Sequence, residues 1–190
     1  MDGCWSPQWR DCIESVKVMG KIQQNFWSKW VPKKHNIFIW RAILDRIPTR
    51  KNLSDKGLDI PCVLCPICEE KEEDSNHLFF GCTLSRVLWM KFGDWWKLKP
   101  PDFENLEDPL KWSWFATKNK KTNGWLQVAI IAVLTTIWKT RNGVVFDKQK
   151  VVTDFEFKKA QELAFQWLSS RDLKFKLDLC NWISNPLNNM

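Results

Sequence analysis

The segment that decides the fold is Cys65-Pro66-Ile67-Cys68, followed after an acidic stretch by His77-Leu78-Phe79-Phe80-Gly81-Cys82. Its spacing is C-x2-C-x8-H-x4-C, which offers three sulfurs and one imidazole. Such a set is complete for one tetrahedral zinc ion of the closed, structural kind, which keeps no open position for a catalytic water. The sequence therefore predicts one structural zinc ion held by Cys65, Cys68, His77 and Cys82.

A second choice of ligands exists, because Cys62-Val63-Leu64-Cys65 is also a CxxC pair. With His77 and Cys82 it would enclose a longer loop. The pair Cys65 and Cys68 is favoured because Pro66 restricts the turn between them. Buried thiols or disulfide partners are a further alternative, which the crowding of four of the seven cysteines into residues 62–82 disfavours. The remaining cysteines, Cys4, Cys12 and Cys180, are predicted to be dispensable for the metal.

Length and composition point to an intracellular globular protein. The chain has 190 residues, of which 44% are hydrophobic, enough for one domain or two small ones. Residues 1–5 lack the basic and apolar regions of a secretory signal, so a reducing compartment is expected, nuclear or cytoplasmic. The longest apolar run, Trp125 to Trp138, is too short to cross a bilayer and predicts a core helix, with no membrane partner.

The net charge of +7 is unevenly distributed along the chain. Residues 29–56 and 118–150 are strongly basic, whereas the loop between Cys68 and His77 is acidic. Separated basic blocks suit a phosphate backbone, although an ordinary solvated surface explains charge alone equally well. His35 is expected at the surface, and most of the 14 tryptophans are expected in the core, with a minority available for stacking on bases. The candidate phosphate contacts are Lys33, Lys34, Arg41, Arg46, Arg50 and Lys51.

Apolar periodicity predicts a mainly α fold, in which a small zinc-stabilised helical domain is followed by a helical C-terminal region. Pro48 is expected to end a first helix, Thr49 to cap a short second one that stops at Gly57, and Ser85 to cap a third. Asn142-Gly143 is expected to end a long apolar helix, and residues 153–156 have the pattern of a capping box. The predicted helices cover residues 37–47, 49–57, 85–96, 125–142 and 153–168, and residues 173–179 form a short strand or an extended tail.

These elements divide the chain into four predicted parts. Residues 1–21 are an N-terminal extension, and residues 22–98 are the zinc-binding domain. The prolines and acidic residues from 99 onward, with the basic segment Lys118 to Gly124, predict a linker and a basic loop over residues 99–124. Residues 125–190 are the helical C-terminal region.

The order of motifs over residues 22–98 resembles the zinc-binding domain that follows the polymerase in plant LINE-type, non-LTR retrotransposon reverse transcriptases. A later segment, residues 137–142 with Phe146, is similar to the part that follows this domain in the same polyproteins. The resemblance implies a role beside nucleic acid and, in a full-length protein, beside the polymerase domain. The matching residues are Phe26-Trp27, Trp30 to Lys33, Phe38 to Arg41, Arg46 to Thr49, Leu53, Gly57, Cys65 to Cys68, His77 to Phe80, Cys82, Ser85 and Trp89.

Polymerase chemistry requires carboxylates that hold two metal ions. The chain contains no adjacent Asp-Asp pair and no palm motif, and its second half shows no acidic arrangement typical of RNase H. We therefore expect no enzyme and no small-molecule substrate. The leading hypothesis is a non-catalytic zinc module that binds RNA or single-stranded nucleic acid. The alternatives are a zinc-stabilised structural or protein-interaction module, or an inert transposon remnant.

Overall fold

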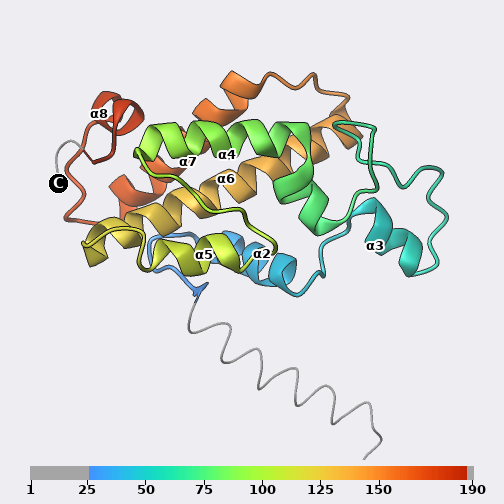
Figure 1. Ribbon diagram of the computed structural model, residues 1–190, viewed down its shortest axis with the longest axis horizontal. Helices are drawn as coiled ribbons and strands as arrows, with labels where there is room; N and C mark the ends of the chain where they lie inside the picture. The colour runs from blue at the N-terminus through green and yellow to red at the C-terminus, as the bar shows by residue number, and fades with distance from the viewer. Residues whose placement is uncertain (1–25, 188–190) are drawn as a thin grey trace, which may run out of the picture.

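The computed structural model describes residues 26–187, whose regular secondary structure is helical and whose helices are joined by turns and extended loops (Figure 1). In this range no strand is assigned, and an isolated β-bridge joins Leu64 and Glu72. The prediction of a mainly α fold is confirmed. The helices are α2 (Lys33–Ile43), α3 (Arg50–Asp55), the π-helix η1 (His77–Gly81), α4 (Thr83–Trp96), α5 (Asp108–Ser113), α6 (Lys120–Asp147), α7 (Thr153–Arg171) and α8 (Leu179–Ser184).

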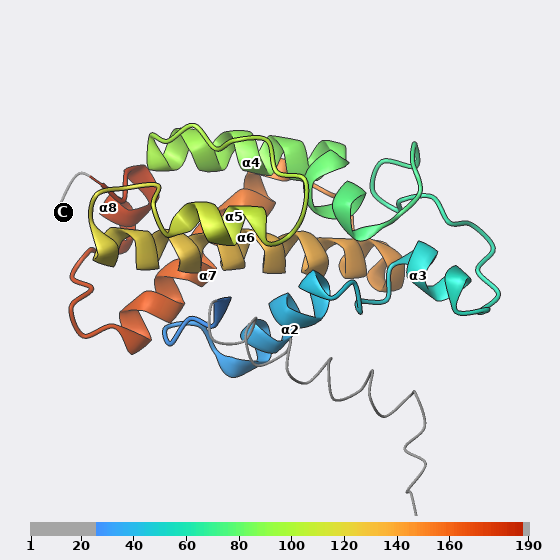
Figure 2. The same ribbon diagram turned by 60° about the horizontal axis from the view of Figure 1, so that its bottom comes forward.

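Helix α6 is the centre of the fold. It runs along the helical body with α4 on one side and α2 on the other, and α7 packs against both α6 and α4 (Figure 2). All seven residues from Val128 to Leu134 are fully buried, because a helix that is apolar on every face must be covered on every face. By length and composition α6 would also pass for a membrane-crossing helix, but 72% of its most apolar window is buried inside the protein. It is a core helix, as the sequence predicted.

Both predicted ends of α6 were wrong. The helix begins at Lys120, inside the expected basic loop, because the Asn119 side chain caps it by accepting hydrogen bonds from the backbone N–H groups of Lys121 and Thr122. It continues past Asn142-Gly143 to Asp147, and Lys148 ends it in the left-handed conformation. Gly143 is buried inside the helix and does not end it, and the nearest side-chain atom to a Cβ placed there would be the flexible Gln149 oxygen, at 2.5 Å.

The helices of the first half also begin and end differently from the predictions. Helix α2 starts four residues earlier than expected and ends at Ile43, before Asp45 takes a positive φ of 51°. Thr49 caps α3 as predicted, because its hydroxyl accepts from the Asn52 backbone N–H. Ser85 does not cap α4: the N-cap is Cys82, and the Ser85 hydroxyl donates to the Cys82 carbonyl.

The C-terminal part contains α7, α8 and an extended segment between them. Helix α7 is where it was predicted, but its N-cap is Val152 and no capping box forms, since Glu156 bonds Thr140 and Lys159 instead. Residues 173–178 are the extended tail and not the strand. They have no partner strand among the described residues, and their anchor is the buried ring of Phe175, 4.9 Å from the Trp125 ring.

Side chains from the first and second halves share the core. The Trp30 ring lies so close to Gly124 that a Cβ there would be 2.3 Å from it. Trp95 of α4 contacts Trp182 of α8 edge to face at 4.9 Å and donates its indole N–H to the Trp182 carbonyl. The part that carries the cysteines therefore packs directly on the C-terminal helices. The four-part division of the chain stays a prediction, and the N-terminal extension, residues 1–21, lies outside the described residues.

Candidate metal centre

The structure brings the four predicted ligands together. The ligand atoms of Cys65, Cys68, His77 and Cys82 all lie within 4.8 Å of one another. The sulfurs of Cys65 and Cys82 are 3.8 Å apart, and the Cys68 sulfur is 3.2 Å from His77 Nε2. Tetrahedral zinc, with Zn–S bonds of about 2.3 Å, requires sulfurs about 3.8 Å apart. The group can hold one metal ion, and its donor set fits zinc.

A tight turn presents Cys65 and Cys68 from the loop after α3. The Glu69 backbone N–H donates to the Cys65 carbonyl at 2.9 Å, and the Cys65 N–H donates to the Lys71 carbonyl at 2.7 Å. Glu69 takes a positive φ of 57°, which reverses the chain immediately after Cys68. These backbone bonds hold both sulfurs on the same side of the loop.

The π-helix η1 presents His77 and Cys82. Its defining bond runs from the Cys82 N–H to the His77 carbonyl at 2.6 Å, so the two ligands are one wide turn apart. The Asp74 carboxylate accepts from the His77 backbone N–H at 2.7 Å and fixes the start of this turn. A Cβ at residue 81 would lie 3.2 Å from His77 Nδ1, so Gly81 leaves room for the imidazole.

The electrostatics around the cluster favour the metal-binding forms of His77 and Cys82 but not that of Cys65. Burial lowers the pKa of His77, which keeps the imidazole neutral at neutral pH, the form that binds metal. A hydrogen bond from the Cys65 thiol lowers the pKa of Cys82 and, together with burial, raises the pKa of Cys65. Cys82 is also the N-cap of α4, and the positive end of that helix stabilises a thiolate. A bound zinc ion would displace the proton that Cys65 and Cys82 share.

Other cysteines do not join the cluster. Cys62 is exposed and lies outside the four-residue group, and Cys180 is exposed on α8. Each of the five described cysteines is a free thiol, so none of them forms a disulfide with another. Cys4 and Cys12 lie outside the described residues.

The acidic loop that precedes His77 is not the fully exposed excursion that its composition indicated. Glu73 is completely buried and forms a two-pronged ion pair with Arg141 of α6, with N–O distances of 2.6 and 2.8 Å. Its carboxylate also accepts from the Arg50 backbone N–H at 2.7 Å. This pair connects the metal-binding loop, residues 56–76, to α3 and to the central helix α6. Sequence reasoning missed it, because Glu73 is one of five acidic residues in a short stretch and nothing local distinguishes it.

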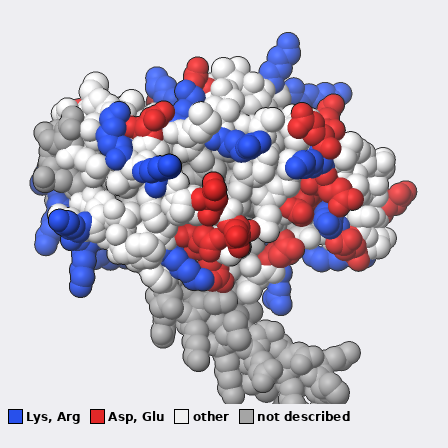
Figure 3. All heavy atoms as spheres, viewed as in Figure 1, with Lys and Arg blue, Asp and Glu red and all other residues white. Residues whose placement is uncertain are grey.

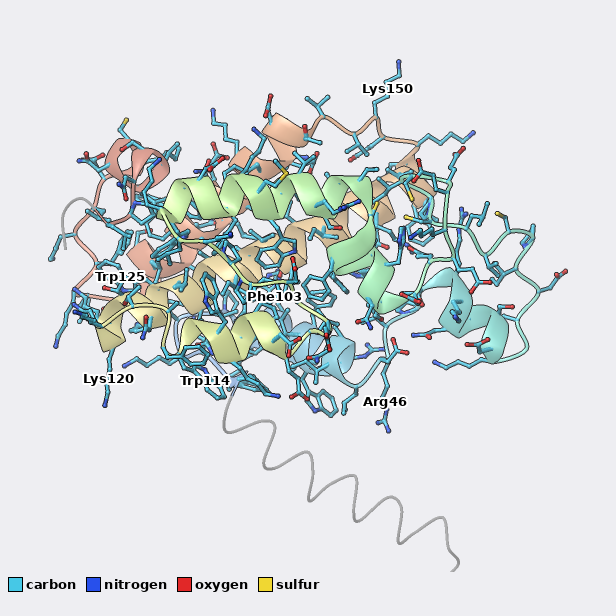
Figure 4. The ribbon with its side chains drawn as sticks, in the orientation of Figure 1. Arg46, Phe103, Trp114, Lys120, Trp125 and Lys150 are labelled. Atoms are coloured by element: carbon cyan, nitrogen blue, oxygen red, sulfur yellow. The ribbon has the colours of Figure 1, made fainter. Side chains whose placement is uncertain are left out.

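The six predicted phosphate contacts are in different surroundings. Lys33, Lys34, Arg41 and Arg46 are exposed, and Figure 4 shows Arg46 pointing away from the protein body. The Arg50 guanidinium is partly buried and donates to the Leu64 carbonyl at 2.8 Å. Lys51 is paired with Glu72 at 3.2 Å. The last two residues therefore support the metal-binding loop.

His35 was predicted at the surface, and this prediction was wrong. It is 8% exposed, and its ring lies 4.6 Å from the Trp167 ring of α7. Burial, with Lys139 and Lys34 nearby, lowers its pKa to about 4. His35 is a core contact between α2 and α7. The sequence indicated a surface position instead, because His35 follows two lysines, Lys33 and Lys34.

Comparison with known protein families identifies the region that carries the cluster. Residues 5–89 match a family model described as zinc-binding in reverse transcriptase. This match includes α2, α3, η1 and all four cluster residues, and α5 to α8 lie beyond it. No catalytic polymerase domain was detected. No curated protein and no solved structure matches the chain significantly.

Proposed function

We propose that this protein is a non-catalytic, zinc-stabilised module that binds RNA or single-stranded nucleic acid. In this proposal it derives from the C-terminal part of a plant LINE-type reverse transcriptase. The motif order over residues 22–98 and the family match over residues 5–89 support that origin. In a longer protein of this kind the polymerase domain would be its neighbour, and its place would be the cytoplasm or the nucleus.

The observation that carries the proposal is the complete four-residue cluster. Three thiolates and one imidazole occupy every position around a tetrahedral ion, so no site remains for an activated water or a substrate. Bound zinc would act as a cross-link between the loop after α3 and the start of α4. Cys65, Cys68, His77 and Cys82 would hold it, and their neighbours orient them.

Charge supports a polyanionic partner. The protein carries a net charge of +7, and Lys33, Lys34 and Arg41 of α2 are exposed and take part in none of the ion pairs found among residues 26–187. The charges are not uniform, however. Figure 3 shows acidic and basic side chains mixed on one face, with many carboxylates at the end formed by α3 and the metal-binding loop. Nucleic acid is therefore expected on a different face.

A salt titration of RNA binding tests the proposal. The zinc-loaded protein and a labelled 20-nucleotide single-stranded RNA would be followed by fluorescence anisotropy from low to physiological salt. Affinity should fall with a log–log slope of about −0.7 for each phosphate contact. Cys68→Ser should lose both zinc and binding, whereas Cys62→Ser should keep its zinc. A folded, zinc-loaded protein that binds no nucleic acid would contradict the proposal and favour a protein-interaction module.

A further inference from the structure

A groove of about 670 Å³ lies beside the metal-binding loop. Its walls come from α2, from α3 and the turn before it, from the segment that contains Cys62, and from the last turns of α6. It therefore joins the family-matched region to the central helix outside that match. Its charged and large apolar lining residues include Lys34, Ile37, Phe38, Arg41, Arg50, Trp138, Arg141 and Phe146.

Every charged side chain that lines this groove is a cation. Arg141 is neutralised by Glu73, which leaves Lys34, Arg41 and Arg50. Lys34 is exposed, the Arg41 guanidinium donates to the Arg46 carbonyl, and the Arg50 guanidinium donates to the Leu64 carbonyl, so no carboxylate among residues 26–187 neutralises these three charges. These three residues belong to the set that the sequence predicted as phosphate contacts. Three of the six predicted phosphate contacts therefore line the same groove.

Two neighbouring hollows differ in charge. One, on the other side of α3, is lined by Lys51 with Asp45, Asp55 and Asp74, which disfavours phosphate. Another hollow, of about 780 Å³ between α6 and α7, has mixed charge, with Asp147, Glu156 and Glu162 beside Lys139 and Lys159. A third hollow near the start of α6 is also cationic, with Lys121, Lys174 and Lys176, but its aromatic residue, Trp125, is only 3% exposed. By charge alone, both this third hollow and the groove beside the metal-binding loop could therefore bind phosphate.

Aromatic and aliphatic surface distinguishes the groove beside the metal-binding loop. Phe38 and Trp138 stack with ring centroids 6.1 Å apart and an interplanar angle of 28°, and both are partly buried. Phe146 is 74% exposed and Ile37 is 45% exposed. Large apolar side chains exposed together typically mark an interaction surface. A ring that is exposed beside three cations offers a face to a base whose phosphates the cations can hold.

We propose that this groove binds a short stretch of single-stranded nucleic acid. The phosphates contact Lys34, Arg41 and Arg50, and a base stacks on Phe146 at the edge of the surface formed by Trp138 and Phe38. This inference rests on the proposed function and gives it a location and a mode of binding. A duplex is excluded from this mode, because its bases are already stacked on one another and present no free face.

The test compares three variants of the zinc-loaded full chain by fluorescence anisotropy. The probe is a labelled eight-nucleotide oligouridylate, with the same strand in a duplex and an abasic strand of equal length as competitors. Lys34→Gln with Arg41→Gln removes two groove charges, and Phe146→Ala removes the exposed ring. Lys174→Gln with Lys176→Gln removes two charges from the other cationic hollow and is the matched control. Zinc content and melting temperature would be measured for each variant.

The groove variants should differ from each other and from the control. Loss of two phosphate contacts should reduce the magnitude of the salt slope by about 1.4. Phe146→Ala should weaken binding by roughly 5- to 150-fold and leave the slope unchanged, since stacking on one base is uncharged. The control should retain the affinity of the unaltered protein, and the duplex and abasic strands should compete poorly.

Contrary results would separate the two proposals. If the unaltered protein binds the oligouridylate but the control loses as much affinity as the groove variants, the groove assignment is wrong and the proposed function stands. Equal competition by the abasic strand would overturn stacking. If no nucleic acid binds, both proposals fail. Binding of an acidic, leucine-rich peptide that is lost in Phe146→Ala, without binding of the strand, would assign the groove to a protein partner.

Discussion

At the scale of single residues, the metal centre depends on the choice among neighbouring cysteines. Cys65 and Cys68 lie in the cluster, whereas Cys62, three residues before Cys65, is exposed and outside it. The motif spacing was enough to predict the four members. It was not enough to describe Cys82 as the N-cap of α4 or Gly81 as space for the imidazole, because both depend on the π-helix.

Replacing a single cysteine by serine should show that Cys68 binds zinc and that Cys62 does not. We expect Cys68→Ser to abolish stoichiometric zinc and to unfold the metal-binding region, because a structural zinc site stabilises a fold by on the order of 10 kcal/mol. Cys62→Ser should keep one zinc ion per chain and its melting temperature. Metal analysis with circular dichroism checks both variants, and loss of zinc from Cys62→Ser alone would mean that the ligand set is misassigned.

The buried ring of His35 should make the stability of the fold depend on pH, separately from the effect of pH on zinc binding. Its pKa falls from 6.5 to about 4 on folding, so between these values the unfolded chain binds more protons than the folded one. The stabilising effect of the neutral ring is complete above pH 6.5 and is lost as the pH falls toward 4. Its upper limit is about 3 kcal/mol.

The variant His35→Phe should isolate this effect, because phenylalanine preserves a ring beside Trp167 and cannot titrate. Acid also releases zinc from both proteins, so the difference between their urea denaturation curves is the informative quantity. That difference should shift in favour of the variant by up to about 3 kcal/mol between pH 6.5 and 4. A difference that does not change with pH would show that His35 is not buried as a neutral ring.

At the scale of elements, the buried pair of Glu73 and Arg141 connects the metal-binding loop to α6. The pattern of apolar residues located the helices, but the pairing of a loop carboxylate with a helix guanidinium is long-range and depends on how α2, α3 and α6 pack. The ends of α6 were missed for a local reason. Asn119 caps the helix within a segment that was interpreted as a basic loop, and the helix continues through Asn142-Gly143, which was interpreted as a stop signal, to Asp147.

Glu73→Gln and Glu72→Gln form a matched pair of substitutions in that loop. Removing the Glu73 charge leaves Arg141 buried without a counter-ion, which should lower the free energy of unfolding by about 3 to 5 kcal/mol. Glu72 pairs with Lys51 at the surface, where solvent screens both charges, so its substitution should change the free energy of unfolding far less. Urea denaturation with saturating zinc checks both. Equal losses would argue that the buried pair does not stabilise the fold.

At the scale of the whole molecule, one continuous core surrounds α6, and side chains from both halves of the chain contribute to it. The sequence predicted the helical class and the metal-binding residues, because both follow from local spacing. It did not predict that His35 contacts α7, that Trp30 fills the space at Gly124, or that three of six candidate cations surround one groove. These features arise from contacts between residues far apart in the sequence, which local periodicity does not contain.

X-ray absorption spectroscopy of the purified, zinc-loaded protein tests the central claim most directly. We predict one zinc ion per chain, with three sulfur neighbours at about 2.3 Å and one nitrogen neighbour at about 2.0 Å. The spectrum should show no water ligand, because the four side chains complete the coordination. A site with a bound water, or with fewer than three sulfurs, would contradict a closed structural centre formed by Cys65, Cys68, His77 and Cys82.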